Sequence, residues 1–235
     1  MLHCYYMNVN CDCSTEQSHA FYKKLPIKRQ ERIKRMTNRQ MAKKKILTGA
    51  FLQSVIRQET GIETERQQYS YNDAGRPFLT NASGRIDFNL SDSGQYAVLA
   101  VSDERVGIDI EYKQRNYRMV AKRFFCKEEY DRILSFEEEK QQNRMFLRYW
   151  TMKEAYVKYE GSGLGVPLNS FRIVWDEPGE HCVVYAVSDN ADTGNADKDI
   201  LLAHGTCAFL PGGYCVSVCQ KNPVEKLHIM ERSVV

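Results

Sequence analysis

The stretch that decides how this sequence is interpreted runs Trp150-Thr151-Met152-Lys153-Glu154-Ala155-Tyr156-Val157-Lys158, followed by Glu160-Gly161-Ser162-Gly163-Leu164-Gly165. It contains no Gly before Gly161 and is rich in good helix formers, which predicts the last turns of a helix that ends at the glycines. Trp150, Glu154 and Lys158 would lie close to one helix face. Taken alone, Glu154 and Lys158 also fit an exposed ion pair worth about 0.2–0.5 kcal/mol.

A second stretch, Arg105-Val106-Gly107-Ile108-Asp109-Ile110-Glu111, alternates with period two, as a half-buried strand does. Its three aliphatic residues are expected to face the core, and Gly107, Asp109 and Glu111 to face the other way, with the glycine leaving room for a ligand. Two carboxylates on one face repel each other, so we expect a positive group between them. Oxygen ligands of this kind suit Mg²⁺ or Mn²⁺. The alternative is two solvated acids on an edge strand.

Together these motifs resemble the signature of the 4'-phosphopantetheinyl transferases. The matching motifs are Gly107-Ile108-Asp109-Ile110-Glu111, then Phe124-Phe125-Cys126-Lys127-Glu128-Glu129-Tyr130, then Trp150-x-x-Lys153-Glu154-Ala155-x-x-Lys158. Gly75-Arg76-Pro77 and Phe88-Asn89-Leu90-Ser91-Asp92-Ser93 extend the resemblance upstream. Three linked motifs at family spacing are much more specific than any one of them. The chain length is similar to the surfactin-type (Sfp-type) monomeric subfamily.

The resemblance implies an α+β fold of two pseudo-symmetric halves, each a long helix packed on a short, mostly antiparallel sheet. The segments 171–175, 181–187, 201–210 and 214–218 alternate as antiparallel strands should. We expect residues 1–104 to contribute to coenzyme A phosphate binding and residues 105–235 to carry the metal-binding and catalytic motifs. Residues 15–58 are expected to be helical with a break at Pro26, and residues 137–159 to form one long helix.

The implied reaction moves the 4'-phosphopantetheine arm of coenzyme A to a serine of an apo acyl or peptidyl carrier protein and releases 3',5'-ADP. Asp109, Glu111 and Glu154 would hold Mg²⁺ with the pyrophosphate oxygens, because attack on a phosphorus needs charge neutralisation. Glu154 is the expected proton acceptor and Glu111 the other candidate. Lys158 would assist the departing phosphate, and Lys153 would neutralise a phosphate. Glu129 matches a family position near the metal.

The segment from Lys28 to Lys45 contains nine basic residues and a single acid, Glu31. The resemblance implies that this segment sends cations to the coenzyme A phosphates. The expected coenzyme contacts are Lys28, Lys43, Lys44, Arg76, Ser91, Asp92, Lys153 and Lys158, although an alignment here can slip by one residue. A solvated charged face and nucleic-acid binding are the other interpretations, but no aromatic residues interleave with the bases.

Asp92 departs from the family pattern, which usually has a His that meets the adenosine 3'-phosphate. A carboxylate about 4 Å from a phosphate would cost roughly 4 kcal/mol at an effective dielectric constant near 20. We therefore expect a neighbouring cation such as Lys43, Lys44 or Arg76 to bridge Asp92 to the phosphate. The alternative is a degenerate relative that binds coenzyme A or a carrier protein with little turnover.

Composition excludes several classes of protein. The net charge is only +3, and no apolar run approaches the 20 residues or so that span a membrane. The N-terminus lacks the pattern of a secretory signal, so the eight cysteines are expected to be free thiols in a reducing cytoplasm. Cys11-x-Cys13 and Cys215-x3-Cys219 lack the second pair that a zinc finger needs. We expect a monomeric, cytoplasmic enzyme that binds neither nucleic acid nor membrane.

Overall fold

The computed structural model describes residues 1–84, 86–112, 116–161, 163–177, 179–187 and 200–234. The chain forms two compact units. Unit 1 is Met1–Glu104 together with His228–Val235, and unit 2 is Arg105–Leu227. The expected boundary also lay after residue 104, but it assigned the last eight residues to the second half. They lie in unit 1 because β11 (Ile229–Glu231) pairs in parallel with β1 (Leu2–Asn8).

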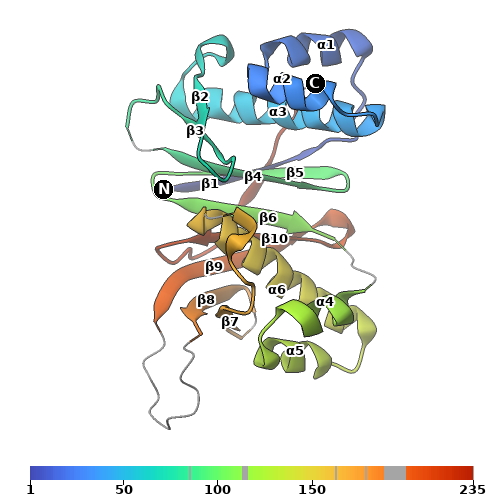
Figure 1. Ribbon diagram of the computed structural model, residues 1–235, viewed down its shortest axis with the longest axis vertical. Helices are drawn as coiled ribbons and strands as arrows, with labels where there is room; N and C mark the ends of the chain where they lie inside the picture. Colours follow the sequence, from blue (N-terminus) through green and yellow to red (C-terminus); the bar gives the residue numbers. More distant parts are fainter. Residues whose placement is uncertain (85, 113–115, 162, 178, 188–199, 235) are drawn as a thin grey trace. The chain divides into compact units, whose positions relative to one another are not determined.

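In unit 1, three helices cover a four-stranded sheet with the order β11-β1-β5-β4 (Figure 1). The other two strands are β4 (Asp87–Ser93) and β5 (Tyr96–Ser102), and the helices are α1 (Thr15–Lys24), α2 (Ile27–Lys34) and α3 (Arg39–Thr60). A short hairpin is formed by β2 (Tyr69–Tyr71) and β3 (Pro77–Leu79). The helical region therefore has a second break, after Lys34, that the single predicted break at Pro26 missed.

Helix α3 has clear local signals at both ends. The Asn38 side chain accepts a hydrogen bond from the Met41 N–H (3.0 Å), and Gly61 ends the helix in the left-handed region (φ 70°). Between these ends, Leu47, Phe51 and other apolar side chains pack with buried residues of β1 and β5. This packing is what holds the basic first turns of α3 beside the sheet of unit 1.

Unit 2 has a five-stranded antiparallel sheet with the order β6-β10-β9-β8-β7, crossed by the long helix α6 (Figure 1). Its strands are β6 (Val106–Glu111), β7 (Phe171–Trp175), β8 (His181–Ala186), β9 (Leu201–Leu210) and β10 (Tyr214–Gln220). Its helices are α4 (Tyr117–Phe124), α5 (Lys127–Leu134) and α6 (Glu139–Glu160). Gly161 ends α6 in the left-handed region (φ 71°), as the Gly-rich run predicted.

Glycine allows α6 to lie unusually close to its sheet. A Cβ atom at Gly107 of β6 would lie 2.0 Å from the Ala155 carbonyl oxygen and 2.6 Å from the Tyr159 nitrogen, both on the α6 backbone. We expected Gly107 to leave room for a ligand, and that expectation is wrong, because the helix backbone occupies the space. The glycine instead brings the acidic strand directly against the helix that carries Glu154.

Both units follow one plan, which is a strand, two short helices, a 22-residue helix and then further strands. In each unit the first strand pairs antiparallel with the last long strand, β1 with β5 and β6 with β10. The predicted α+β class with two similarly built halves is confirmed. None of the helices in the described part of the chain has the length and apolar character that a membrane span requires.

Candidate active site

Two motifs from the sequence meet where β6 lies against α6. The Lys158 ammonium donates a hydrogen bond to Asp109 Oδ1 (2.7 Å) and another to the Ile108 carbonyl (3.2 Å). The Asp109 side chain is only 10% exposed and that of Lys158 28%. Lys158 therefore forms a partly buried ion pair that joins two elements, and Asp109 faces helix α6.

Glu154 belongs to the same charged group. Burial raises the pKa of its carboxyl, and the nearby Asp109 charge raises it further, whereas Lys158 opposes both effects. Such a rise is expected where two carboxylates share a partly buried site and one cation does not offset both. Such a site attracts a further cation, and one or two carboxylates completed by substrate oxygens are a usual environment for Mg²⁺.

Glu111 lies at the end of β6, opposite Cys215 of β10. It is half-buried, and its Oε1 accepts a hydrogen bond from the Tyr112 N–H (2.9 Å). Within the ranges that the structure describes, no three His, Cys, Asp or Glu side chains gather closely enough to hold a metal ion. Asp109 and Glu154 are close enough for the charge of one to affect the other, and both carry oxygen donors of the kind that suits Mg²⁺.

Lys153 does not lie where the sequence predicted. Its side chain is fully buried, and its ammonium bonds to Glu129 Oε2 (2.9 Å) and to the carbonyls of Leu168 (2.7 Å) and Phe171 (2.9 Å). It cannot neutralise a phosphate from this position, because three protein acceptors in the core already surround it. Burial lowers the pKa of Lys153, and the Glu129 charge opposes that shift.

Glu129 is equally enclosed, with 2% of its side chain exposed. Its two oxygens accept hydrogen bonds from the Cys126 N–H (3.0 Å) and the Ile173 N–H (2.8 Å), in addition to the contact with Lys153. Burial raises the pKa of the Glu129 carboxyl against the effect of Lys153. The expected position near a metal is not supported, because Glu129 is bound on all sides by protein groups.

In unit 1, Lys45 is the cation that holds Asp92. Its ammonium contacts both carboxylate oxygens, at 2.6 Å and 2.8 Å. The candidates from the sequence were Lys43, Lys44 and Arg76, but the contact with Asp92 comes from Lys45. Lys44 donates to the Gly94 carbonyl (2.9 Å), and the charge of Lys43 opposes the rise that burial causes in the Cys13 pKa.

The remaining unit 1 candidates lie around β4 and the β2–β3 hairpin. Arg76 pairs with Asp87 and donates to the Phe88 carbonyl (3.1 Å). Ser91 is buried in β4, opposite Val98 of β5, and the Lys28 ammonium lies 4.2 Å from the centre of the Tyr71 ring. Unit 1 thus gathers cations from α2, α3 and the hairpin near Asp92 and its strand.

Sequence reasoning missed two basic residues of this group, Lys45 and Arg29. Arg29 is half-buried, and its Nη2 donates to the Lys45 carbonyl (3.2 Å). Burial lowers the pKa of Arg29, and the nearby Tyr71 and Asp92 oppose that shift. The available signal was the basic run itself, because Lys45 directly follows two lysines that the alignment did select.

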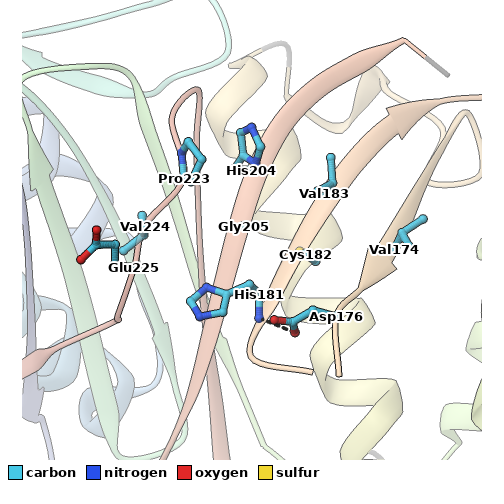
Figure 2. Close-up of a pocket in the computed structure, with 10 residues that line it drawn as sticks. All are labelled: Val174, Asp176, His181, Cys182, Val183, His204, Gly205, Pro223, Val224 and Glu225. Atoms are coloured by element: carbon cyan, nitrogen blue, oxygen red, sulfur yellow. Dashed lines mark hydrogen bonds between the residues drawn. The ribbon is translucent and has the colours of Figure 1, made fainter. Parts of the chain in front are cut away.

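Two cavities in unit 2 lie apart from the Asp109 group. One, of about 320 Å³, lies on the open face of β8 and β9, where Figure 2 shows His181 and His204 beside the Pro223–Glu225 segment. The other, of about 450 Å³, lies between α5, α6 and β7 and is lined by Arg132, Arg148 and Trp175 among others. Among the described residues that the sequence motifs include, Glu128 and Glu129 line the second cavity.

Comparison with known proteins adds independent evidence. Residues 105–219 match the family model described as the 4'-phosphopantetheinyl transferase superfamily, and residues 11–104 match the model of the N-terminal region of a 4'-phosphopantetheinyl transferase. The chain is 33% identical over 188 residues to the 4'-phosphopantetheinyl transferase psf-1 of Bacillus pumilus, which covers 80% of this chain and 75% of that protein. It is 29% identical over 214 residues to the 4'-phosphopantetheinyl transferase Sfp of Bacillus subtilis (strain 168), covering 89% and 88%.

Among solved structures, the holo-[acyl-carrier-protein] synthase of Thermotoga maritima matches with a TM-score of 0.37 and 20% identity. That match covers 50% of this chain and 63% of that one.

Proposed function

The chain belongs to the 4'-phosphopantetheinyl transferase superfamily. On this basis we propose which of its residues bind the metal, which bind the donor phosphates and which move the proton during transfer. It is an enzyme of that type, which transfers phosphopantetheine to a carrier protein. The proposed donor is coenzyme A, the acceptor a serine hydroxyl of an apo acyl or peptidyl carrier protein, and the leaving group 3',5'-ADP. The observation that carries the proposal is the group formed by Asp109, Glu154 and Lys158 where β6 meets α6.

Asp109 and Glu154 are the proposed protein ligands of Mg²⁺, with Glu111 as a third carboxylate at the end of β6. The raised pKa of Glu154 beside Asp109 supports this set, because a divalent cation relieves the repulsion between two carboxylates. When bound, Mg²⁺ would polarise the pyrophosphate oxygens and neutralise the charge that develops on them. No other protein metal site is proposed.

Proton transfer is assigned to the carboxylates of the same group. The serine hydroxyl must lose its proton as it attacks, and Glu154 is the proposed acceptor, directly or through water, with Glu111 as the alternative. Lys158 already lies against Asp109 Oδ1 at 2.7 Å. We assign it to the departing phosphate, where an ammonium stabilises the charge that grows as the bond to phosphorus breaks.

The unit 1 cations are the proposed binding site for the remaining coenzyme A phosphate. Lys28, Lys44, Lys45 and Arg76 supply charge, and the Ser91 hydroxyl supplies a donor. Lys45 enters the set because it holds Asp92, the residue at the family's histidine position. Lys43 stays a further candidate, and Lys153 leaves the set because it is buried in unit 2.

The deciding experiment incubates the purified chain with coenzyme A, Mg²⁺ and an apo carrier protein and measures the intact mass of the carrier. A gain equal to the mass of the phosphopantetheine arm is the expected result. A thermal shift with coenzyme A but no mass gain would instead identify a degenerate binder. Salt-sensitive retention of RNA or DNA without any response to coenzyme A would contradict the proposal altogether. The monomeric state and the cytoplasmic location stay predictions.

A further inference from the structure

The buried pair of Glu129 and Lys153 lies at the free edge of the unit 2 sheet. β7 is the last strand in the sheet order, so within the described ranges its outer backbone groups have no neighbouring strand. Glu129 accepts the outward Ile173 N–H (2.8 Å), and Lys153 donates to the outward Phe171 carbonyl (2.9 Å). The pair thus joins three elements, with Glu129 on α5, Lys153 on α6 and two backbone groups on β7.

Helix α6 is therefore held on both sides of Glu154. On one side, the Lys153 ammonium ties the helix to the Leu168 and Phe171 carbonyls and to α5. On the other side, the Ala155 backbone packs directly on Gly107 of β6. Successive residues of a helix project about 100° apart, since one turn holds 3.6 residues. Fixing Lys153 therefore fixes the direction in which Glu154 projects.

This restraint opposes a force within the site itself. Glu154 and Asp109 carry like charges close enough to perturb each other. Their repulsion favours any small rotation of α6 that separates the two carboxylates. An anchor one residue from Glu154 resists that rotation before a cation binds, and preorganised ligands bind a metal more tightly than ligands that must first be ordered.

We propose that the Glu129–Lys153 pair is a positioning device that sets the rotation of α6 and thereby holds Glu154 opposite Asp109 for metal binding. The inference rests on the proposed function, because it takes Asp109 and Glu154 as the metal ligands. It gives Lys153 and Glu129 an indirect role, in which neither residue touches the substrate.

The test titrates Mn²⁺ into the full-length protein with coenzyme A present and no carrier, and follows the free ion by electron paramagnetic resonance. The variants are Lys153→Met and the neutral double variant Glu129→Gln with Lys153→Met. Gln keeps an acceptor for the Ile173 N–H and leaves no uncompensated buried charge, whereas Met has no donor for the Leu168 and Phe171 carbonyls. Both variants are expected to bind Mn²⁺ about tenfold more weakly or worse, the scale seen when a supporting group of a metal site is removed.

Two matched controls separate positioning from general stability. Lys127→Met removes the ammonium of an exposed pair with Asp131 on α5, and it should leave Mn²⁺ affinity unchanged. Met145→Ala opens a cavity in the core that contains α6 without touching the pair, and it too should leave the affinity unchanged although it lowers the melting temperature.

The possible outcomes are distinct. Wild-type affinity in the double variant would overturn the inference, because the pair would then be structural only. An equal loss of affinity in Met145→Ala would overturn it as well. If the wild-type protein bound no Mn²⁺, or bound it equally well after Asp109→Asn, the proposed metal site itself would be wrong and the inference would fall with it.

Discussion

At the scale of single residues, the contact between Asp109 and Lys158 decides how the site responds to substitution. Asp109 is buried, so removing its side chain has two effects, the loss of a proposed metal ligand and the loss of the partner of a partly buried ammonium. Asn keeps the shape and an acceptor oxygen but removes the charge. It therefore tests the ligand role more cleanly than Ala.

Asp109→Asn is expected to lower kcat for transfer by roughly a hundredfold or more, the scale on which single electrostatic contacts to a transition state act. The measurement is carrier mass gain against time at saturating coenzyme A. Asp131→Asn, in the exposed pair with Lys127, is the matched control and should transfer normally. Near-normal transfer by folded Asp109→Asn would show that the metal site is misplaced.

The contact between Lys45 and Asp92 predicts how the chain selects its donor. With Lys45 in place the Asp92 charge is compensated, so Asp92→His should change KM for coenzyme A by less than about tenfold. Lys45→Met leaves Asp92 facing the proposed phosphate position alone. It should raise KM for coenzyme A about tenfold or more, and much less for dephospho-coenzyme A, which lacks the 3'-phosphate.

Steady-state kinetics with both donors checks this prediction. Lys24→Met is the matched control, because Lys24 forms an exposed pair with Glu65 in the same unit. A wild-type preference for dephospho-coenzyme A would contradict the compensation by Lys45. It would also favour the degenerate-binder interpretation.

At the scale of elements, the interface between α6 and β6 depends on the absence of one side chain. Gly107→Ala places a methyl group 2.0 Å from the Ala155 carbonyl oxygen, and a helix backbone cannot move aside as a flexible side chain can. The expected loss is about 3 kcal/mol in the free energy of unfolding, at the upper end for overpacked sites. Urea denaturation measures it. Gly165→Ala is the control, because a Cβ there meets nothing within 4 Å.

The buried pair predicts a stability that depends on pH. Lys153→Met leaves the Glu129 carboxylate uncompensated and should destabilise the fold by about 3–5 kcal/mol at neutral pH. Burial raises the pKa of Glu129, and without Lys153 only the hydrogen bonds from the Ile173 and Cys126 N–H groups oppose that rise. The folded variant then binds a proton that the unfolded chain does not, so its stability falls as pH rises through the raised pKa.

The measurement for this prediction is the melting temperature of Lys153→Met relative to wild type from mildly acidic to mildly alkaline pH. The deficit should shrink on the acidic side, where Glu129 becomes neutral. Adding Glu129→Gln should remove the pH dependence of the deficit. A deficit that stayed constant over this range would show that Glu129 keeps its charge without Lys153.

Many of the bounds of the helices and strands could be predicted from the sequence. Strands 171–175 and 201–210 have the predicted bounds, and α6 differs by two residues at its start and one at its end. The sequence prediction missed the break before α3. Asn38 is a strong N-cap signal, but basic residues lie on both sides of it, so composition alone did not mark a boundary. Lys153 was misplaced because periodicity does not tell which helix face a distant Glu129 will cover. Lys45 was missed because one residue along a helix turns a side chain by about 100°.

At the scale of the whole molecule, the repeated plan of the two units was expected from the family resemblance but has no visible sequence repeat. The two units share features of the backbone instead. Each has a 22-residue helix that ends at a glycine in the left-handed region, Gly61 in unit 1 and Gly161 in unit 2. Such positions constrain only a few residues each, and the apolar positions between them accept many side chains. The plan can therefore persist while the sequences of the two halves diverge.

The return of the chain end to unit 1 could not be predicted, because β11 has only three residues and its partner lies more than two hundred positions away. Cys4 pairs with Ile229 and Tyr6 with Glu231 in parallel register, and the Arg232 N–H donates to the Tyr6 carbonyl (2.9 Å). The Arg232 guanidinium also lies over the Tyr5 ring, 5.5 Å from its centre. Without this strand, β1 would become an exposed sheet edge.

Deleting residues 228–235 should therefore loosen unit 1, although the deleted segment follows unit 2 in the sequence. Hydrogen exchange followed by mass spectrometry should show amides of β1 exchanging about tenfold faster or more, because exchange reports local opening. Amides of β9 and β10 should keep their wild-type rates, since the segment has no pairing with either strand. Ile229→Pro is the second variant. This substitution disrupts the β11 backbone without shortening the chain. If both variants showed faster exchange in unit 2 alone, the assignment of the segment to unit 1 would be wrong.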